Sequence, residues 1–175
     1  RNHRQAAGKY DVLLARSELE YGLTDNLQIA GYVNSYSASI DQNYTNTEIC
    51  GTSPTCTSGF PIPSSHGRSA PFNQKGIDGY SLEAIYRLTN PVIEPLGIGF
   101  YIEPTVGKLK NELETRLLLQ SNFLDDRLIV ASNIVFANEQ LKFLGQGNVP
   151  ESMLDVLFGF SYRFAPKWFA GMEAR

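Results

Sequence analysis

The feature that most constrains this fold is a two-residue alternation that runs through residues 111–136. Charged side chains such as Glu112 and Glu114 occur at every second position, and apolar side chains such as Leu113 and Leu117 occur at positions between them. Side chains along a β-strand point alternately to opposite faces, whereas a helix would need apolar residues three and four positions apart. With a short polar turn in its middle, this stretch predicts a β-hairpin with one apolar face and one charged face.

The same alternation recurs along the chain and predicts about eight strands and no helix. The expected strands are residues 10–23, 27–40, 79–88, 97–106, 111–120, 128–136, 153–164 and 168–175. Residues 1–9 are expected to form a loop. Short connections are expected near residues 24, 92, 107, 124 and 166, and long ones at residues 41–78 and 140–152. Apart from the turn near residue 107, short and long connections alternate, which is typical of an up-and-down antiparallel meander.

Length and composition limit the possible classes of protein. A chain of 175 residues suits one domain, and we expect residues 1–175 to form a single β-barrel domain. The net charge is −3 without a basic patch, so no nucleic-acid partner is expected. There is no apolar run of about 18 residues, which excludes a transmembrane helix but leaves a membrane β-barrel open, because its apolar residues are dispersed by alternation.

The alternation alone permits two opposite arrangements of the faces. A soluble barrel or sandwich would turn the apolar face inward, and a membrane barrel would turn it toward lipid. Several observations favour the membrane arrangement. The expected strands of about 10–14 residues are long for a soluble sheet and suit tilted membrane spans. Aromatic residues lie at strand ends, and the polar face contains almost no lysine.

The stretch from Ser17 to Tyr32, Ser-Glu-Leu-Glu-Tyr-Gly-Leu-Thr-Asp-Asn-Leu-Gln-Ile-Ala-Gly-Tyr, combines strand, turn and strand. Two comparable segments also lead from a strand into a turn: Tyr-Arg-Leu-Thr, which begins at Tyr86, and Tyr-Arg-Phe-Ala, which begins at Tyr162. In these phrases the sequence resembles Gram-negative outer-membrane β-barrel proteins, either porin-like or of uncharacterised outer-membrane families. The resemblance implies an up-and-down antiparallel transmembrane β-barrel in the outer membrane of the cell, with the lipid bilayer as its main partner.

The polar faces of the expected strands would line the lumen of such a barrel. Their charged members are Arg16, Glu18, Glu20, Glu83, Arg87, Glu103, Glu112, Glu114, Arg116, Arg163 and Glu173. Charges inside a barrel must be paired or hydrated, because an unpaired buried charge is very costly. One interpretation is a water-filled lumen that passes small solutes, with an acidic bias that favours cations. The alternative is a filled, salt-bridged interior that conducts nothing, and strand number decides between them.

The aromatic residues beside the short turns predict a membrane-interface girdle. Its expected members are Tyr21, Tyr86, Tyr162, Phe164 and Trp168. Aromatic rings are amphipathic and gather where lipid meets water, so their repetition at one end of the strands and on the apolar face favours a girdle. The ordinary β-propensity of tyrosine is the alternative explanation.

The connection at 41–78 is expected to be a long extracellular loop, since it is rich in Ser, Thr, Asn, Gly and Pro. Its two cysteines, Cys50 and Cys56, predict a disulfide that closes a small loop in an oxidising compartment, with free thiols as the alternative. The second functional class left open is a structural or surface-binding barrel that acts through this loop without conductance.

Enzyme chemistry is not expected. Both histidines, His3 and His66, fall in expected loops, and the adjacent Ser64 and Ser65 lack a base held in place by a third group. The closely spaced glutamates Glu18/Glu20 and Glu112/Glu114 are explained more simply as lining of the barrel lumen than as glycosidase carboxylates. No phosphate-binding glycine loop and no metal-ligand cluster is present, so neither a cofactor nor a metal is predicted.

Topology further predicts that the strands are part of a larger barrel. If the short turns lie at the periplasmic end, the first expected strand begins outside, and the last one, residues 168–175, is short for a span. We therefore expect a parent barrel of about 10–14 strands. In the structure, residues 10–22 and 168–175 should then be unpaired with each other, leaving an open curved sheet.

Overall fold

The fold is a single antiparallel sheet, seen in a computed structural model that describes residues 2–5, 8–41, 71–143 and 147–175. Its strands are β1 (Asn2–Gln5), β2 (Gly8–Gly22), β3 (Leu27–Asp41), β4 (Phe72–Arg87), β5 (Gly97–Gly107), β6 (Lys110–Phe123), β7 (Leu128–Phe143), β8 (Gly147–Ala165) and β9 (Trp168–Ala174). The described residues contain no helix. The all-β prediction is confirmed, with a ninth, four-residue strand added at the start.

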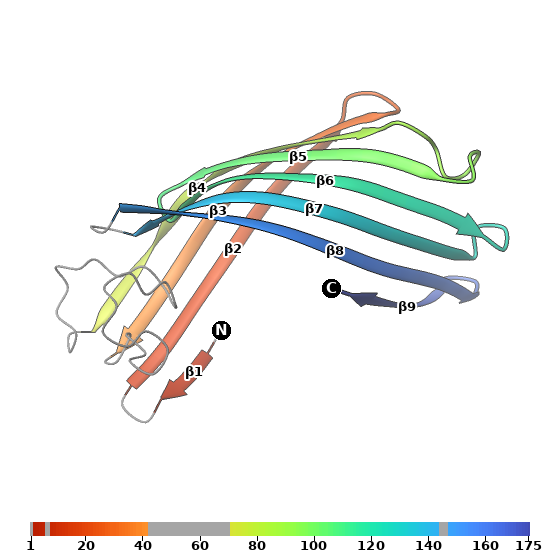
Figure 1. Ribbon diagram of the computed structural model, residues 1–175. Helices are drawn as coiled ribbons and strands as arrows, with labels where there is room; N and C mark the ends of the chain where they lie inside the picture. Colours follow the sequence, from red (N-terminus) through yellow and green to blue (C-terminus); the bar gives the residue numbers. More distant parts are fainter. Residues whose placement is uncertain (1, 6–7, 42–70, 144–146) are drawn as a thin grey trace.

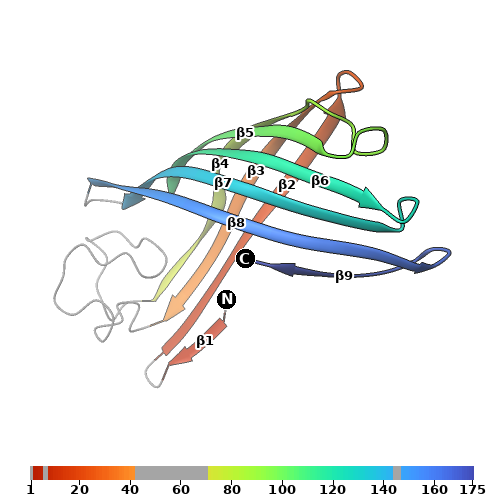
Figure 2. The ribbon, with the colours of Figure 1, turned by 45° about the vertical axis from the view of Figure 1, so that its right-hand side comes forward.

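The strands lie in the sheet in their order along the chain, from β1 to β9, and each pairs only with its sequence neighbours. The sheet curls into a partial barrel in which β2 and β3 pass behind β6, β7 and β8 in both views (Figures 1 and 2). Strands β1 and β9 are its two edges and do not pair with each other. The predicted up-and-down topology and the predicted open sheet are therefore both confirmed.

The hairpin predicted within residues 111–136 is formed by β6 and β7. Its register pairs Glu112 with Glu139 on one face of the sheet and Leu117 with Ile134 on the other. The turn between the strands contains three consecutive residues with positive φ, from Leu124 to Asp126. Aspartate tolerates this conformation, but the branched leucine side chain does so at a cost.

Three expected connections were wrong in extent. Residues 2–5 form β1 and pair with the start of β2, where a loop was expected. Residues 140–152 largely extend β7 and β8, whose register continues to Phe143 opposite Gly147. Pro150 is tolerated there because β9 pairs only with β8 residues from Phe158 onward, which leaves the Pro150 segment at an edge of the sheet. The connection at 41–78 is also shorter, because β4 already begins at Phe72.

A β-bulge explains why the early part of β4 escaped the alternation rule. Asn34 pairs with Gly79 and the next residue, Ser35, pairs with Ile77, so Asp78 has no partner in β3. One extra residue shifts the parity of a strand by one. Before the bulge, even-numbered residues of β4 share the face of Tyr36, and after it odd-numbered residues do.

The bulge also holds the neighbouring turn. A carboxylate oxygen of Asp78 accepts the backbone N–H of Leu109 at 2.7 Å, and its carbonyl accepts that of Lys108 at 2.9 Å. Next to it, Gly79 approaches β5 so closely that a Cβ would lie 2.0 Å from the carbonyl oxygen of Val106. Glycine is therefore required where β4 passes the β5–β6 turn.

The two faces of the sheet differ sharply in exposure. Odd-numbered side chains of β2 and even-numbered ones of β8 lie on the convex face, where Leu19 is 81% and Phe158 51% exposed. On the opposite, concave face, Ser81, Glu83 and Glu103 are at most 6% exposed. The distribution is the reverse of a soluble sandwich, since large apolar side chains are outside and carboxylates are inside.

Candidate functional site

The strongest concentration of interacting polar groups is a network on the concave face of β2–β6. We call it the central network and define it by Arg16, Glu18, Tyr32, Glu83, Tyr101, Glu103, Glu114 and Arg116. The pairing register places all eight on one face of the sheet, because residues that pair directly point to the same side.

An ion pair across the curl is the clearest feature of this network. Arg16 in β2 donates from Nη2 to Oε1 of Glu103 in β5 at 2.6 Å. In a flat sheet, strands three positions apart are separated by about 14 Å. The pair can close only because the sheet curls and both side chains point into its concavity. It therefore identifies the polar face as the inner face.

Glu103 receives donors from three directions. Besides Arg16, its carboxylate accepts the hydroxyl of Tyr101, and Oγ1 of Thr105 lies 3.3 Å from Oε1. The carboxylate is almost completely buried. A buried carboxylate without such partners would be very unfavourable, so these donors compensate for the burial of Glu103 inside the curl.

Tyr32 connects the two sides of the network. Its hydroxyl lies 2.5 Å from Oε2 of Glu83 and 2.9 Å from Oε1 of Glu18, while the Arg16 guanidinium stacks 3.9 Å from its ring centre. A phenol carries one proton, so it donates to one of these carboxylates at a time. The stacked guanidinium adds a cation–π contact on the ring face.

A second unit of the same composition lies on β5 and β6. The guanidinium of Arg116 is 4.3 Å from the ring centre of Tyr101, and its Nε donates to Glu114 at 2.5 Å. The Tyr101 hydroxyl in turn donates to Glu103. Each unit thus joins an arginine, a tyrosine ring and glutamates, and the Arg16–Glu103 pair links the two.

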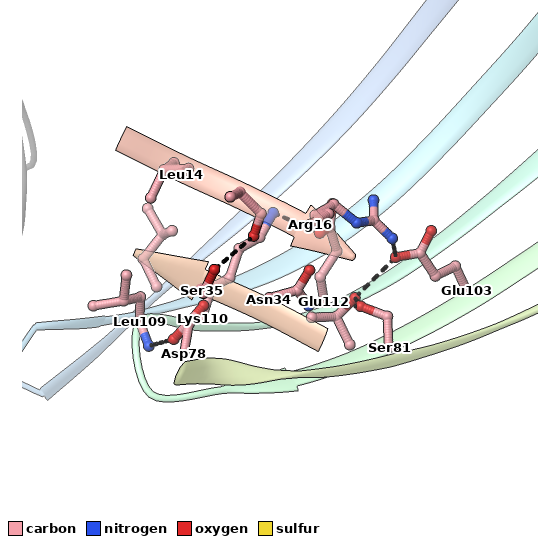
Figure 3. A pocket seen from close by; sticks show the side chains of 13 residues that line it. Leu14, Arg16, Asn34, Ser35, Asp78, Ser81, Glu103, Leu109, Lys110 and Glu112 are labelled. Atoms are coloured by element: carbon pink, nitrogen blue, oxygen red, sulfur yellow. Dashed lines mark hydrogen bonds and ion pairs between the residues drawn. The ribbon is translucent and has the colours of Figure 1, made fainter. Parts of the chain in front are cut away.

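The network surrounds an open hollow of about 440 Å³. The residues that line it are Arg16, Glu18, Glu20, Gln28, Tyr32, Glu83, Ile85, Tyr101, Arg116 and Leu118. Carboxylates outnumber guanidinium groups in this lining by three to two. A second cavity adjoins it toward the β5–β6 turn (Figure 3).

Near that turn, a smaller cluster combines one ammonium with two carboxylates. Lys110 Nζ lies 2.5 Å from Oε2 of Glu112 and 2.9 Å from Oε1 of Glu139. The two carboxylates stand directly opposite each other in the β6–β7 ladder. Like charges in this position repel, so the shared ammonium is what makes the pairing tolerable.

The remaining predicted lumen residues lie on the same face but outside the central network. Arg87 donates to the carbonyl of Asp25 at 2.7 Å and to the side chain of Asn26, so it fastens the β2–β3 turn. Arg163 in β8 pairs with Phe169, and Glu173 in β9 pairs with Gly159, so they lie on opposite sides of the Ser161–Gly171 pair, two ladder positions from it in each direction. Whether the whole set lines a lumen stays a prediction.

Sequence reasoning missed the two tyrosines as members of the site. Both Tyr32 and Tyr101 occupy positions on the polar face of their strands, and this placement was the signal that could have identified them. It also missed Lys110, which opens β6, and Glu139, because the strand containing it was predicted to end at residue 136. Their charges became interpretable only with the register.

The predicted girdle residues lie at the ends of strands beside the short turns. Tyr21, Tyr86 and Phe164 are about half to two-thirds exposed, and the ring of Trp168 lies 6.5 Å from that of Phe164. Tyr162 is less exposed and lies beneath the guanidinium of Arg127, 5.5 Å from its ring centre. Their contact with a bilayer stays a prediction.

The sequence also predicted a disulfide and predicted no metal site. Cys50 and Cys56, and with them the predicted disulfide, lie outside the described residues. Among the residues that are described, no three or more His, Cys, Asp or Glu side chains form a group able to hold a metal ion. In the same part of the chain, no helix has the length and apolar character needed to cross a membrane.

Comparison with known proteins gives a family and a distant structural likeness. No curated protein matches the sequence. The open form of the ferric-catecholate import receptor Fiu from E. coli K12, a crystal structure, is similar at 14% identity with a TM-score of 0.45. The match covers 95% of this chain and 25% of the receptor, so the chain spans about a quarter of that protein's length. Over residues 1–175 the sequence matches the family of unknown function DUF6662, and the chain belongs to that family.

Proposed function

We propose that this chain forms part of a β-barrel of the bacterial outer membrane, whose charged interior lets small solutes pass and favours cations. The observation that carries the proposal is the sidedness of the sheet. Carboxylates and guanidinium groups interlock on the concave face, and large apolar side chains such as Leu82 and Phe158 stand exposed on the convex face. Lipid is the environment that stabilises such an outer surface.

Strand length supports the same proposal. Strands β2 to β8 have between 11 and 19 residues, whereas a tilted transmembrane strand needs about 9–11. The ends therefore have length to reach through the headgroup regions. In such a barrel, Trp168 and Tyr21 would lie at the interface beside the short turns.

The cation preference rests on the charge of the concave face. The predicted interior set contains seven glutamates and four arginines, and the 440 Å³ hollow has Glu18 and Glu20 at its exposed rim. Negative charge in a confined aqueous path raises the local concentration of cations and excludes anions.

Planar-bilayer recordings on the full-length protein test the proposal. In a KCl gradient we expect discrete conductance steps and a reversal potential on the cation-selective side. The double variant Glu18→Gln/Glu20→Gln should move the reversal potential toward zero, because it removes two negative charges from the rim of the hollow.

Glu94→Gln is the matched control, since Glu94 is an exposed carboxylate in the β4–β5 connection, outside the hollow. It should leave selectivity as it is. An absence of conductance in well-inserted protein would rule out the channel, and an anion-selective reversal potential would rule out the role of the glutamates.

A further inference from the structure

The second cavity of the concave face has the size of a small-molecule site. Its volume is about 320 Å³, and it lies between β2 and the β5–β6 turn, beyond the Arg16–Glu103 pair (Figure 3). Ligand pockets in proteins usually fall between about 300 and 1,000 Å³. The curl of the sheet creates the cavity by bringing β2 opposite β6 and β7.

One side of this cavity is apolar. Leu14 from β2, Leu109 from the β5–β6 turn and Leu141 from β7 line it together. They come from three separate parts of the chain, and the rest of the cavity lining consists mainly of polar side chains. An aliphatic group that replaced water against them would gain free energy in proportion to the area that it covers.

The other side carries an excess of negative charge. The lining contains the carboxylates of Asp78, Glu103 and Glu112 but only two cationic groups, those of Arg16 and Lys110. Arg16 is committed to Glu103 at 2.6 Å. Lys110 also forms an ion pair with Glu139, which does not line the cavity. Glu112 therefore shares the Lys110 ammonium with a second carboxylate.

From this juxtaposition of three leucines and an under-compensated glutamate we propose that the cavity binds a small organic monocation with an aliphatic body. Its ammonium group would lie against Glu112, and its carbon chain would lie against Leu14, Leu109 and Leu141. An anion would add to the existing excess of negative charge, and a neutral alcohol would leave that excess uncompensated.

Calorimetric titration of the full-length protein in detergent micelles tests this inference, with the heat of protein-free micelles subtracted. The probes are n-pentylammonium, pentanoate and pentanol, which share one carbon chain and differ in charge. Pentylammonium should bind at least about tenfold more tightly than either of the other two. Equal binding of pentanoate would overturn the proposal.

Two variants and a control locate the site. Glu112→Gln should weaken pentylammonium binding about tenfold, and Leu141→Ala should weaken it several-fold without changing any charge. Glu151→Gln is the control, because Glu151 stands opposite Glu139 in the β7–β8 ladder but does not line the cavity.

If Glu112→Gln does not fold, Leu141→Ala decides the outcome by itself. Unchanged affinity in the folded variants, or an equal loss in Glu151→Gln, would overturn the assignment. The inference goes beyond solute passage, and binding is measured without conductance, so its failure would leave the proposed channel untouched, and the reverse also holds.

Discussion

The concave faces of β2–β6 and of β7–β9 belong to one sheet, yet they are built differently. On β2–β6, long charged side chains and tyrosines interlock within strands and between neighbouring strands, and Arg16 reaches across the curl to Glu103. On β7, the inner positions around Val135 and Ala137 are buried but small and apolar. Every residue of β9 is exposed.

The difference indicates two ways of holding a curved sheet. The curl of β2–β6 is tied by side chains that reach across it, so its shape depends on polar contacts. Strands β7–β9 are joined by backbone ladders, and their large side chains, such as Phe158 and Phe160, lie on the convex face. Their stability should therefore depend on what covers that outer face.

The largest expected effect tests the outer face of β8. In the full-length protein refolded into lipid vesicles, Phe158→Arg should lower the free energy of unfolding by about 2–4 kcal/mol if it lies near the bilayer midplane. Urea titration followed by the fluorescence of Trp168, the only tryptophan, gives the measurement.

Leu157→Arg is the control for that change, because Leu157 is the adjacent residue on the concave face. It should cost much less, since its guanidinium would reach water inside the curl. A larger loss for Leu157→Arg than for Phe158→Arg would reverse the assignment of the faces.

The next effect tests the tie within β2–β6. Glu103→Ala removes the acceptor of Arg16 and Tyr101 and should destabilise the protein by about 1.5–3 kcal/mol. The figure lies below that for a fully buried pair, because the Arg16 side chain is 48% exposed and can be hydrated.

Glu173→Ala makes the same change in β9, where the side chain is exposed, and should alter stability by less than about 0.5 kcal/mol. If the two alanine variants were equally stable, the central network would contribute nothing to the curl.

A smaller effect separates the two regions at the level of single hydroxyl groups. Tyr32→Phe leaves Glu83 buried without its phenol donor and should cost about 1–2 kcal/mol. In β8, Tyr162→Phe loses only an exposed contact of 3.2 Å with Arg127 and should cost a few tenths of a kcal/mol. Similar losses in the same urea titrations would contradict the distinction.

The smallest effect concerns the turn that joins the two regions. Leu124 has φ of 57°, so Leu124→Gly should relieve backbone strain and raise stability by up to about 1 kcal/mol. The Arg16–Glu103 tie should be unaffected, which a double variant with Glu103→Ala would show as additive changes. A destabilised Leu124→Gly protein would mean that the leucine side chain contributes more than its backbone costs.

Much of the fold was accessible from the alternation alone. Strand identity, topology and the face of each charged residue follow from a period of two, and the Glu112–Leu117 segment shows why: every position agrees with one parity. The failures lie where local signals mislead. Gly147 and Pro150 look like loop residues, but they lie in a strand that is unpaired on one side.

The contacts of the site were less accessible, because they depend on curvature. No spacing in the sequence connects Arg16 to Glu103, which are 87 residues apart. Pairing register determines which residues share a face, but only the radius of the curl determines which of them meet across it. Tyr32 and Lys110, by contrast, meet partners on the same or on neighbouring strands, so the register is enough to explain their contacts.

The extra residue at Asp78 makes β4 two half-strands in opposite phase. Phe72 packs against Ile40 and Ala38 on the inner face, and Ile77 lies on the outer face, because Asp78 is left out of the pairing with β3. If Asp78 were instead paired with Ser35, the bulge would disappear and the first half of the strand would slip by one residue, which would turn Phe72 outward and Ile77 inward. A search of related sequences for regular alternation would therefore have to read this strand in two frames, one on each side of Asp78.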